Sequence, residues 1–328
     1  MNWRRSLAVL LIFGFVTAGC AAPKIRLFTD GTVPYDEYTL EGTGKDKILM
    51  VPIEGKISEA PSRGWLRDRP GLVQNVVAQL RKAEADQRIK ALVLKINSPG
   101  GSVTASDILY HELKAYQART QVKIIAVFMG LAASGGYYAA LPADRIVAHP
   151  TSITGSVGVI FVGHRIDGLM EKIGMAVDVN KSGQNKDTGS PFRPRTREET
   201  ALIQDLTDQL GQRFFDLVMA HRRLTPGALE EVQTARIFLA PRALELGLVD
   251  EIGYVSDALE AARREAGLNA DARVVVYRRN EYPDDTVYNT AAAGGGTARP
   301  ALVDLGLPTG MLEARGGFYY LWTPAAVE

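Results

Sequence analysis

Residues 91–101 read Ala-Leu-Val-Leu-Lys-Ile-Asn-Ser-Pro-Gly-Gly, an apolar run that stops at a serine, a proline and two glycines. The run has the length and the aliphatic character of a buried strand, and its Pro-Gly-Gly end is typical of a turn. A stretch with helical character follows over residues 103–118. Residues 91–118 therefore predict a strand, a glycine turn and a helix, which is the repeating unit of an α/β fold.

The same order recurs along the rest of the chain. Short apolar runs alternate with segments in which apolar residues fall on one side of a helix, and this alternation predicts a mostly parallel sheet. The expected strands are 47–53, 91–96, 122–128, 145–148 and 273–277, and the expected helices are 71–86, 103–118, 196–222 and 255–266, with a short helix beginning at Ser134.

The N-terminus has the pattern of a secretory signal. Two arginines precede the apolar segment Leu7–Phe15, which is shorter than the ~20 residues needed to span a bilayer. Cys20 is the only cysteine, so an intramolecular disulfide is excluded, and it follows the small residues Thr17-Ala18-Gly19. We expect residues 1–19 to be a lipoprotein signal peptide and Cys20 to carry the lipid. An ordinary signal peptide and an uncleaved anchor are the alternatives.

Composition divides the chain after Cys20 into three parts. Residues 20–44 are rich in Gly, Thr, Asp and Pro and are expected to form a tether. Residues 45–280 hold nearly all the periodic segments and are long enough to bury the core of a single domain. Residues 281–328 contain a low-complexity linker and the aromatic tail Gly316–Trp322, which we expect to pack on a neighbouring subunit or to contact the membrane surface.

The charge balance argues against several classes of partner. Lys and Arg total 38 and Asp and Glu total 37, which gives a net charge of +1. The chain therefore lacks the excess of positive charge that is typical of nucleic-acid-binding proteins. His, Cys and carboxylate residues do not cluster with metal-ligand spacing. We therefore expect no metal and no nucleic-acid partner.

Ser134 opens the run Ser-Gly-Gly-Tyr-Tyr soon after the strand expected at 122–128. A serine hydroxyl is a poor nucleophile until a base takes its proton, and the neutral amine of a lysine can be that base. Gly135 next to the serine, and Gly100 or Gly101 after the 91–96 strand, can direct backbone amides at an oxyanion. Each glycine junction alone could be only a tight turn. Their joint occurrence with a serine favours catalysis.

These motifs resemble the signal peptide peptidase A family of serine–lysine proteases. In that family the nucleophile lies in a run like the one at Ser134, and a Ser-Gly-x-x-Lys-Asp run, matched at 182–187, implies Lys186 as the base. A Thr-Gly-Ser-x-Gly run, matched at 154–158, implies that Ser156 orients the lysine. The resemblance covers roughly Lys47–Gly253 and implies a Clp/crotonase-type α/β fold of repeated ββα-like units, without cofactors.

Three alternatives to a serine–lysine protease were weighed. The related Clp proteases share the Asn-Ser-Pro-Gly-Gly run but use a histidine base, and neither His149 nor His164 has the required spacing from Ser134. Crotonase relatives use the same oxyanion arrangement on acyl-CoA without a nucleophile, which a lipoprotein signal disfavours. An inactive envelope scaffold would be expected to lack the serine or the lysine, and this chain has both.

The resemblance also implies a location and an assembly. It implies a membrane-anchored endopeptidase that faces the periplasm and cleaves peptides such as remnant signal peptides. Ala21 and Ala22 after the lipid cysteine favour the outer membrane in a Gram-negative organism. Some family members hold two protease units in one chain and take serine and lysine from different halves. This chain has one unit, so we expect a homo-oligomeric ring with shared active sites, in which Ser134 and Lys186 of a single chain need not be in reach.

Overall fold

The computed structural model describes residues 33–63, 68–289 and 317–324. Its strands are β1 (Asp36–Glu41), β2 (Lys47–Glu54), β3 (Ser62–Arg63), β4 (Asp68–Arg69), β5 (Ile89–Ser98), β6 (Gly100–Ser102), β7 (Lys123–Ala133), β8 (Arg145–Ala148), β9 (Ile153–Gly155), β10 (Ile160–Val162), β11 (Ile237–Leu239), β12 (Glu251–Ile252), β13 (Arg273–Arg278) and β14 (Gly317–Leu321). Its helices are α2 (Leu72–Glu84), α3 (Val103–Thr120), α4 (Gly135–Ala140), α5 (Asp167–Lys172), α6 (Arg197–His221), α7 (Pro226–Gln233), α8 (Ala240–Glu245) and α9 (Val255–Ala266).

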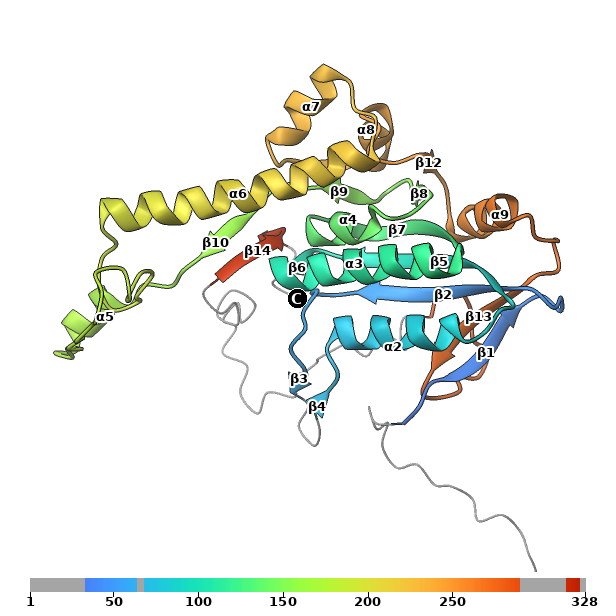
Figure 1. The fold of residues 1–328 in the computed structure, drawn as a ribbon, viewed down its shortest axis with the longest axis horizontal. Coiled ribbons are helices and arrows are strands. Elements are labelled where there is room, and N and C mark those ends of the chain that lie inside the picture. The colour runs from blue at the N-terminus through green and yellow to red at the C-terminus, as the bar shows by residue number, and fades with distance from the viewer. Residues whose placement is uncertain (1–32, 64–67, 290–316, 325–328) are drawn as a thin grey trace, which may run out of the picture. The chain divides into compact units, whose positions relative to one another are not determined.

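A mostly parallel sheet forms the centre of the fold (Figure 1). Its strand order is β1-β13-β2-β5-β7-β8-β12, with β9 beside the end of β7 and β11 beside β9. The pairs from β13 through β12 are parallel, and β1 and β11 are the antiparallel members. Because the carboxyl ends of parallel strands meet at one edge, the turns after β5 and β7 lie next to each other.

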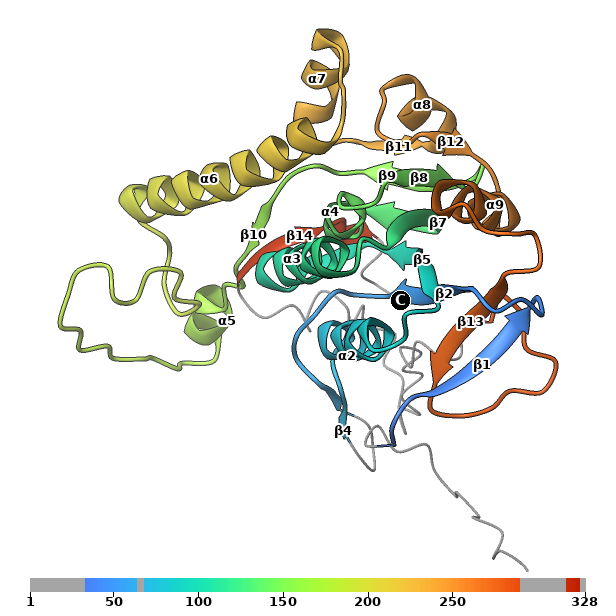
Figure 2. The same cartoon turned by 45° about the vertical axis from the view of Figure 1, so that its right-hand side comes forward.

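Two apolar layers cover the two faces of the sheet (Figure 2). On β5, Leu92, Leu94 and Ile96 face the layer that includes α2, α3 and α4, while Ala91 and Val93 face the layer that includes α9. All five side chains are fully buried. A strand that is covered on both faces has an almost uninterrupted apolar sequence, which explains the run that predicted it.

The α/β fold with a mostly parallel sheet confirms the sequence prediction. The strand at 145–148 and the helix at 255–266 have the predicted bounds, and the ends of the other predicted elements differ by a few residues. No helix in the described part of the chain combines the length and apolar character needed to cross a bilayer.

The N-terminal boundary of the folded domain corrects the prediction. Residues 36–41, which composition placed in the tether, form β1 and pair with β13 from Asp36↔Arg278 onward. Tyr38 and Leu40 pack against the α9 layer, whereas Asp36, Thr39 and Glu41 are exposed. An edge strand with one solvent-exposed face is rich in polar residues. The composition of residues 36–41 therefore suggested a linker.

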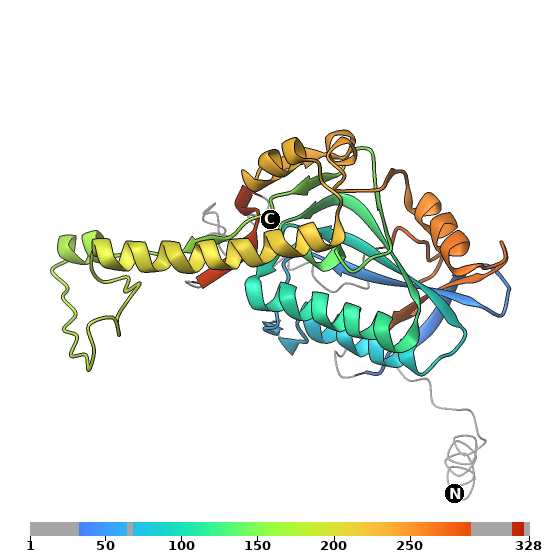
Figure 3. The same cartoon turned by 45° about the horizontal axis from the view of Figure 1, so that its top comes forward.

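A long helix and the segment before it extend beyond the sheet (Figures 1 and 3). The C-terminal half of α6 packs on the core through Phe214 and Val218, which are fully buried. The segment of residues 163–196, here called the arm, contains α5 and leads into the N-terminus of α6. The helix begins with a capping box, in which the Thr196 side chain accepts from the Glu199 amide and the Glu199 carboxylate accepts from the Thr196 amide.

The C-terminal strand β14 belongs to a second, three-stranded sheet with the order β10-β14-β6. It is antiparallel to both neighbours. The aromatic tail, expected to pack on another subunit or on a membrane, therefore packs on its own chain. Tyr320 is fully buried there and Tyr319 is buried as well. This pairing joins residues far apart in sequence, so local patterns could not reveal it.

Candidate active site

Ser134 lies where β7 ends and α4 begins, and its backbone is unusual. Its φ of 53° and ψ of −117° are values that residues with side chains rarely adopt, so the surrounding structure must hold them. The Ser134 amide donates to the Gly155 carbonyl at 2.8 Å, and its carbonyl accepts from the Tyr138 amide at 2.9 Å. A sharp strand-to-helix turn of this kind is how α/β hydrolases present a nucleophilic serine.

The Ser134 hydroxyl itself is buried and makes no hydrogen bond within the described residues. A buried hydroxyl without a partner is uncommon, because it loses its bonds to water without replacement. Such a group in a strained turn is a candidate for a function that supplies the missing partner. Ser134 is therefore a candidate functional residue.

The two glycine junctions meet next to Ser134. A Cβ on Gly135 would lie 3.1 Å from both the Gly101 amide nitrogen and the Gly100 Cα, and a Cβ on Gly100 would lie 2.6 Å from the Gly135 amide nitrogen. Side chains at these positions would force the two turns apart. Gly100 also has a φ of 96°, which favours glycine.

The hydrogen bonds of the first junction indicate which amide can serve an oxyanion. The Gly100 amide donates to the Ser98 hydroxyl at 3.1 Å and is therefore occupied. The Gly101 amide lies beside Gly135, at the N-terminus of α4. Of the two glycines that the sequence left open, Gly101 is thus the one whose amide is not bonded to Ser98 and lies beside Gly135.

Ser156 lies beside Ser134. It directly follows β9, whose Gly155 pairs with Ala133 of β7. Ser156 has a φ of 51°, and its amide donates to the Arg236 carbonyl at 2.8 Å. The structure therefore brings Ser134, Ser156 and the glycine junctions to one edge of the sheet.

Lys186 lies apart from this group, in the arm between α5 and α6. It is exposed, and its amide donates to the Gly183 carbonyl at 3.1 Å. Because the Ser134 hydroxyl has no hydrogen-bond partner among the described residues, it makes no bond to Lys186 within one chain. This arrangement agrees with the expectation that Ser134 and Lys186 of a single chain need not lie within hydrogen-bond reach of each other.

An ionic network fixes the arm near Lys186. Arg193 donates to Asp187 at 2.9 Å and to Glu199 at 2.8 Å, and Lys181 donates to Asp187 at 2.7 Å. The bonds from Arg193, and then from Lys181, hold the pKa of Asp187 well below its usual range. Bonds from Arg193, and then from the Thr196 amide, lower the pKa of Glu199 to about 2. Both carboxylates are therefore ionised near neutral pH, and the Lys186 segment is tied to the start of α6.

The arm also exposes many large apolar side chains. The exposed fraction is 39% at Ile166 and 62% at Ile173. Apolar residues gathered on an exposed segment usually mark an interaction surface. The exposed members are Ile166, Leu169, Ile173, Met175, Val177, Val179 and Phe192.

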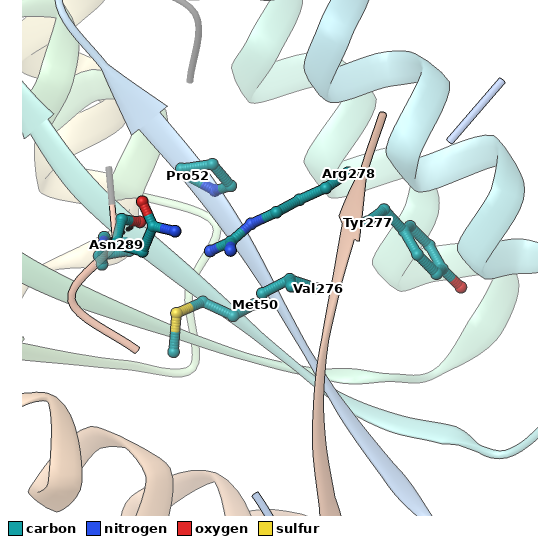
Figure 4. Close-up of a pocket in the computed structure, with 7 residues that line it drawn as sticks. Met50, Pro52, Val276, Tyr277, Arg278 and Asn289 are labelled. Carbon is teal, nitrogen blue, oxygen red and sulfur yellow. Dashed lines mark hydrogen bonds between the residues drawn. The ribbon is translucent and has the colours of Figure 1, made fainter. Parts of the chain in front are cut away.

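A separate cavity, drawn in Figure 4, lies among β2, β13 and the segment after β13. It is lined in part by Lys95, whose buried amine donates to the Val287 and Asn289 carbonyls at 3.1 and 3.3 Å. Burial lowers the pKa of Lys95 and raises that of Glu54, which lies 3.7 Å from the amine. None of the predicted site residues in the described part of the chain lines this cavity. The bonds of Lys95 fasten residues 287–289 to the sheet.

Among the described residues, His, Cys, Asp and Glu side chains form no group of three or more that could hold a metal ion. Cys20 and the predicted signal peptide lie outside the described residues, so lipidation stays a prediction. The network of Asp187, Arg193 and Glu199 was not foreseen from the sequence. Its only sequence signal was the capping-box spacing of Thr196 and Glu199.

Comparison with known proteins agrees with this geometry. The sequence profile of peptidase family S49 matches residues 116–269, and the Clp protease profile matches residues 69–153. A putative signal peptide peptidase SppA from Enterococcus faecium is 34% identical over 255 residues, which are 78% of this chain and 74% of that protein. This chain belongs to the signal peptide peptidase family, S49. As a member of family S49, the chain is a serine-type peptidase.

Other relatives extend the comparison. A putative protease, slr0021, from Synechocystis sp. is 38% identical over 227 residues, which are 69% of this chain and 77% of that protein. The chloroplastic serine protease SPPA of Arabidopsis thaliana is 32% identical over 256 residues, covering 75% of this chain but 37% of that protein. Among solved structures, a mutant ClpP1 from Listeria monocytogenes matches 64% of this chain and 94% of its own with a TM-score of 0.42 and 19% identity.

Proposed function

We propose that this chain is an endopeptidase in which Ser134 is the nucleophile and Lys186 is the base. The observation that carries the proposal is the strained backbone of Ser134, which lies beside two converging glycine junctions. Its buried hydroxyl has no hydrogen-bond partner among the residues that the structure describes. Membership in a serine peptidase family supports this reading over the acyl-CoA alternative.

The proposed reaction proceeds by acyl transfer. The Ser134 Oγ attacks the scissile carbonyl while its proton passes to the neutral Lys186 amine. The amides of Gly101 and Gly135 donate to the oxyanion of the tetrahedral intermediate. Lys186 then gives the proton to the leaving amine, and a water that it activates hydrolyses the acyl-enzyme. Ser156 orients the lysine amine from its place beside Ser134.

The lysine is proposed to come from a neighbouring copy of the chain. Lys186 lies on an arm whose exposed apolar residues need a covering surface, and the Asp187–Arg193–Glu199 network holds this segment in a fixed conformation. Head-to-tail contacts of this kind close into a ring when the rotation between copies allows it. We therefore expect a ring-like homo-oligomer with shared active sites.

The proposed substrates are extended peptides such as remnant signal peptides. The edge of β6 accepts an antiparallel strand next to the glycine junctions, as its pairing with β14 demonstrates. The proposed location is the bacterial cell envelope, with a lipid on Cys20 and the domain facing the periplasm. The outer membrane is favoured in a Gram-negative organism.

A fluorophosphonate probe combined with a peptidase assay tests this function. The wild-type protein should be labelled and Ser134→Ala should not, and Lys186→Met should lose turnover. Lys172→Met is the matched control, because Lys172 is an exposed lysine on the same arm. Labelling of Ser134→Ala, or undiminished turnover in Lys186→Met, would refute the proposed pair. The acyl-CoA alternative predicts no labelling of either protein.

A further inference from the structure

We propose that Ser98 is a positioning residue for the oxyanion site, which makes the Gly101 amide the donor from the first glycine junction. The proposal rests on the proposed peptidase function. Ser98 is the last residue of β5, directly before the turn Pro99-Gly100-Gly101, and its side chain is fully buried. Because it is buried, Ser98 does not touch a substrate, and it acts through the backbone beside it.

The Ser98 hydroxyl makes two hydrogen bonds that fix the start of the turn. It donates to the Gly55 carbonyl at 2.7 Å and accepts from the Gly100 amide at 3.1 Å. A serine hydroxyl has a single donor, so the bond to Gly55 sets its orientation and leaves a lone pair for Gly100. The Gly100 amide is thereby turned toward Ser98 and is withdrawn from an oxyanion.

The next peptide group of the turn is held by the segment that follows β2. The Ile57 amide donates to the Gly100 carbonyl at 2.8 Å, and the Ser102 amide donates to the Ile57 carbonyl at 3.1 Å. The carbonyl and the N–H of a planar trans peptide group point in opposite directions, so the bond from Ile57 directs the Gly101 amide away from Ile57. The nitrogen of this amide lies beside Gly135, 3.1 Å from an added Gly135 Cβ.

Ser98 connects these parts into one unit. The Gly55 amide donates to the Asn97 carbonyl at 2.9 Å, so the bond from Ser98 to Gly55 is a second link between the same two segments. Ser98 also lies against the second junction, since a Cβ on Gly136 would lie 2.7 Å from the Ser98 carbonyl oxygen. Without the hydroxyl, the buried Gly100 amide loses this partner. We expect the turn to rearrange and to carry the Gly101 amide away from the oxyanion.

The first test compares the steady-state kinetics of wild type and Ser98→Ala. A missing oxyanion donor lowers kcat by ~10²–10³, and a misplaced donor should cost less, so we expect kcat to fall at least about tenfold. KM should change less than about twofold, because the donor acts mainly in the transition state. Undiminished kcat in a folded Ser98→Ala protein would overturn the proposal.

Ser152→Ala is the matched control for this comparison. Ser152 is also fully buried, and its hydroxyl also donates to a backbone carbonyl, that of Phe128 at 3.0 Å. Both variants therefore lose a buried serine hydroxyl, but only Ser98 bonds the glycine turn. Ser152→Ala should keep the kcat of wild type, and an equal loss of kcat in the two variants would overturn the proposal.

The second test uses a peptide aldehyde, which mimics the tetrahedral intermediate. The Ser134 Oγ bonds to the aldehyde carbon, the π pair of the carbonyl moves to its oxygen, and the serine proton passes to the base or to that oxygen. We expect the inhibition constant to rise in Ser98→Ala by about the factor by which kcat falls. An uncleaved peptide should bind Ser134→Ala and Ser134→Ala/Ser98→Ala equally. An unchanged inhibition constant, or an equal loss of peptide binding, would overturn the proposal.

Hydrogen exchange tests the positioning without turnover. Exchange in a fragment covering residues 97–102 should be faster in Ser98→Ala than in wild type, and it should be unchanged in Ser152→Ala. Equal exchange in wild type and Ser98→Ala would overturn the proposal. If exchange rises as expected while fluorophosphonate does not label the wild-type protein, the peptidase function fails and the role of Ser98 in holding the turn stands.

Discussion

Replacing Gly135 by alanine tests whether the two glycine junctions form the oxyanion site. The new Cβ would lie 3.1 Å from both the Gly101 amide nitrogen and the Gly100 Cα, and it would overlap the Ser106 hydroxyl. The junctions must then move apart, whereas oxyanion donors act over a narrow range of distances. Loss of one such donor typically costs ~10²–10³ in kcat, or about 2.7–4 kcal/mol in the barrier.

The expected loss of activity exceeds the expected loss of stability. Overpacking by one methyl group costs about 1–3 kcal/mol, which a domain stable by about 5–15 kcal/mol tolerates. We therefore expect Gly135→Ala to stay folded, with Tm lowered by a few degrees and kcat reduced at least about a hundredfold. Peptidase kinetics and thermal unfolding measure the two effects separately.

Two further variants make this test specific. Gly211→Ala is the control, because Gly211 lies within α6 and no atom of the described residues would lie within 4 Å of its added Cβ. This variant should keep full activity. Ser106→Ala combined with Gly135→Ala removes the overlapping hydroxyl but keeps both 3.1 Å backbone contacts, so turnover should stay low. Turnover of Gly135→Ala within about threefold of wild type, in a folded protein, would refute the assigned oxyanion site.

Three other predictions follow from the site and the chain's N-terminus. Peptidase activity should rise as the pH is raised from acid, because only the neutral Lys186 amine accepts the serine proton; a rate that is highest in acid would contradict a lysine base. The Asp187–Arg193–Glu199 network should stabilise the protein at pH values above 4.5, the ordinary pKa of a Glu side chain. This stabilisation should be lost as the pH falls toward about 2, the pKa of Glu199 in the folded protein. The Tm difference between wild type and Arg193→Met should therefore shrink over that range, and a constant difference would show that the charges are not responsible. Cys20→Ser should abolish the incorporation of labelled fatty acid in cells, and an unlabelled wild-type protein would show that Cys20 carries no lipid.

The sequence predicted the parts of the fold that burial and glycine geometry control. Residues 91–96 and 145–148 are covered on both faces of the sheet, so their apolar runs predicted strands. Gly100 and Gly135 predicted close turns, because a side chain at either position would collide with the other junction. Ser134 was found because it directly precedes the second of these glycines.

The missed features depend on contacts between distant residues. β1 was read as a tether because its outward face is polar, and its pairing with β13 is non-local. The tail was predicted to pack elsewhere because nothing near residues 317–321 indicates β6 as their partner. Lys186 lies in the exposed arm, and the surface that would cover this arm is proposed to belong to a second copy. A local pattern carries no information about such a surface.

Mixing Ser134→Ala protein with Lys186→Ala protein tests the central claim most directly. Each variant alone should be inactive, because every site lacks either the nucleophile or the base. In a random equal mixture obtained by co-expression with two different tags, about one quarter of the interfaces in a ring should pair an intact serine with an intact lysine. We predict that assemblies carrying both tags recover about one quarter of the wild-type turnover. Mixed assemblies that form but stay inactive would contradict a site shared between copies.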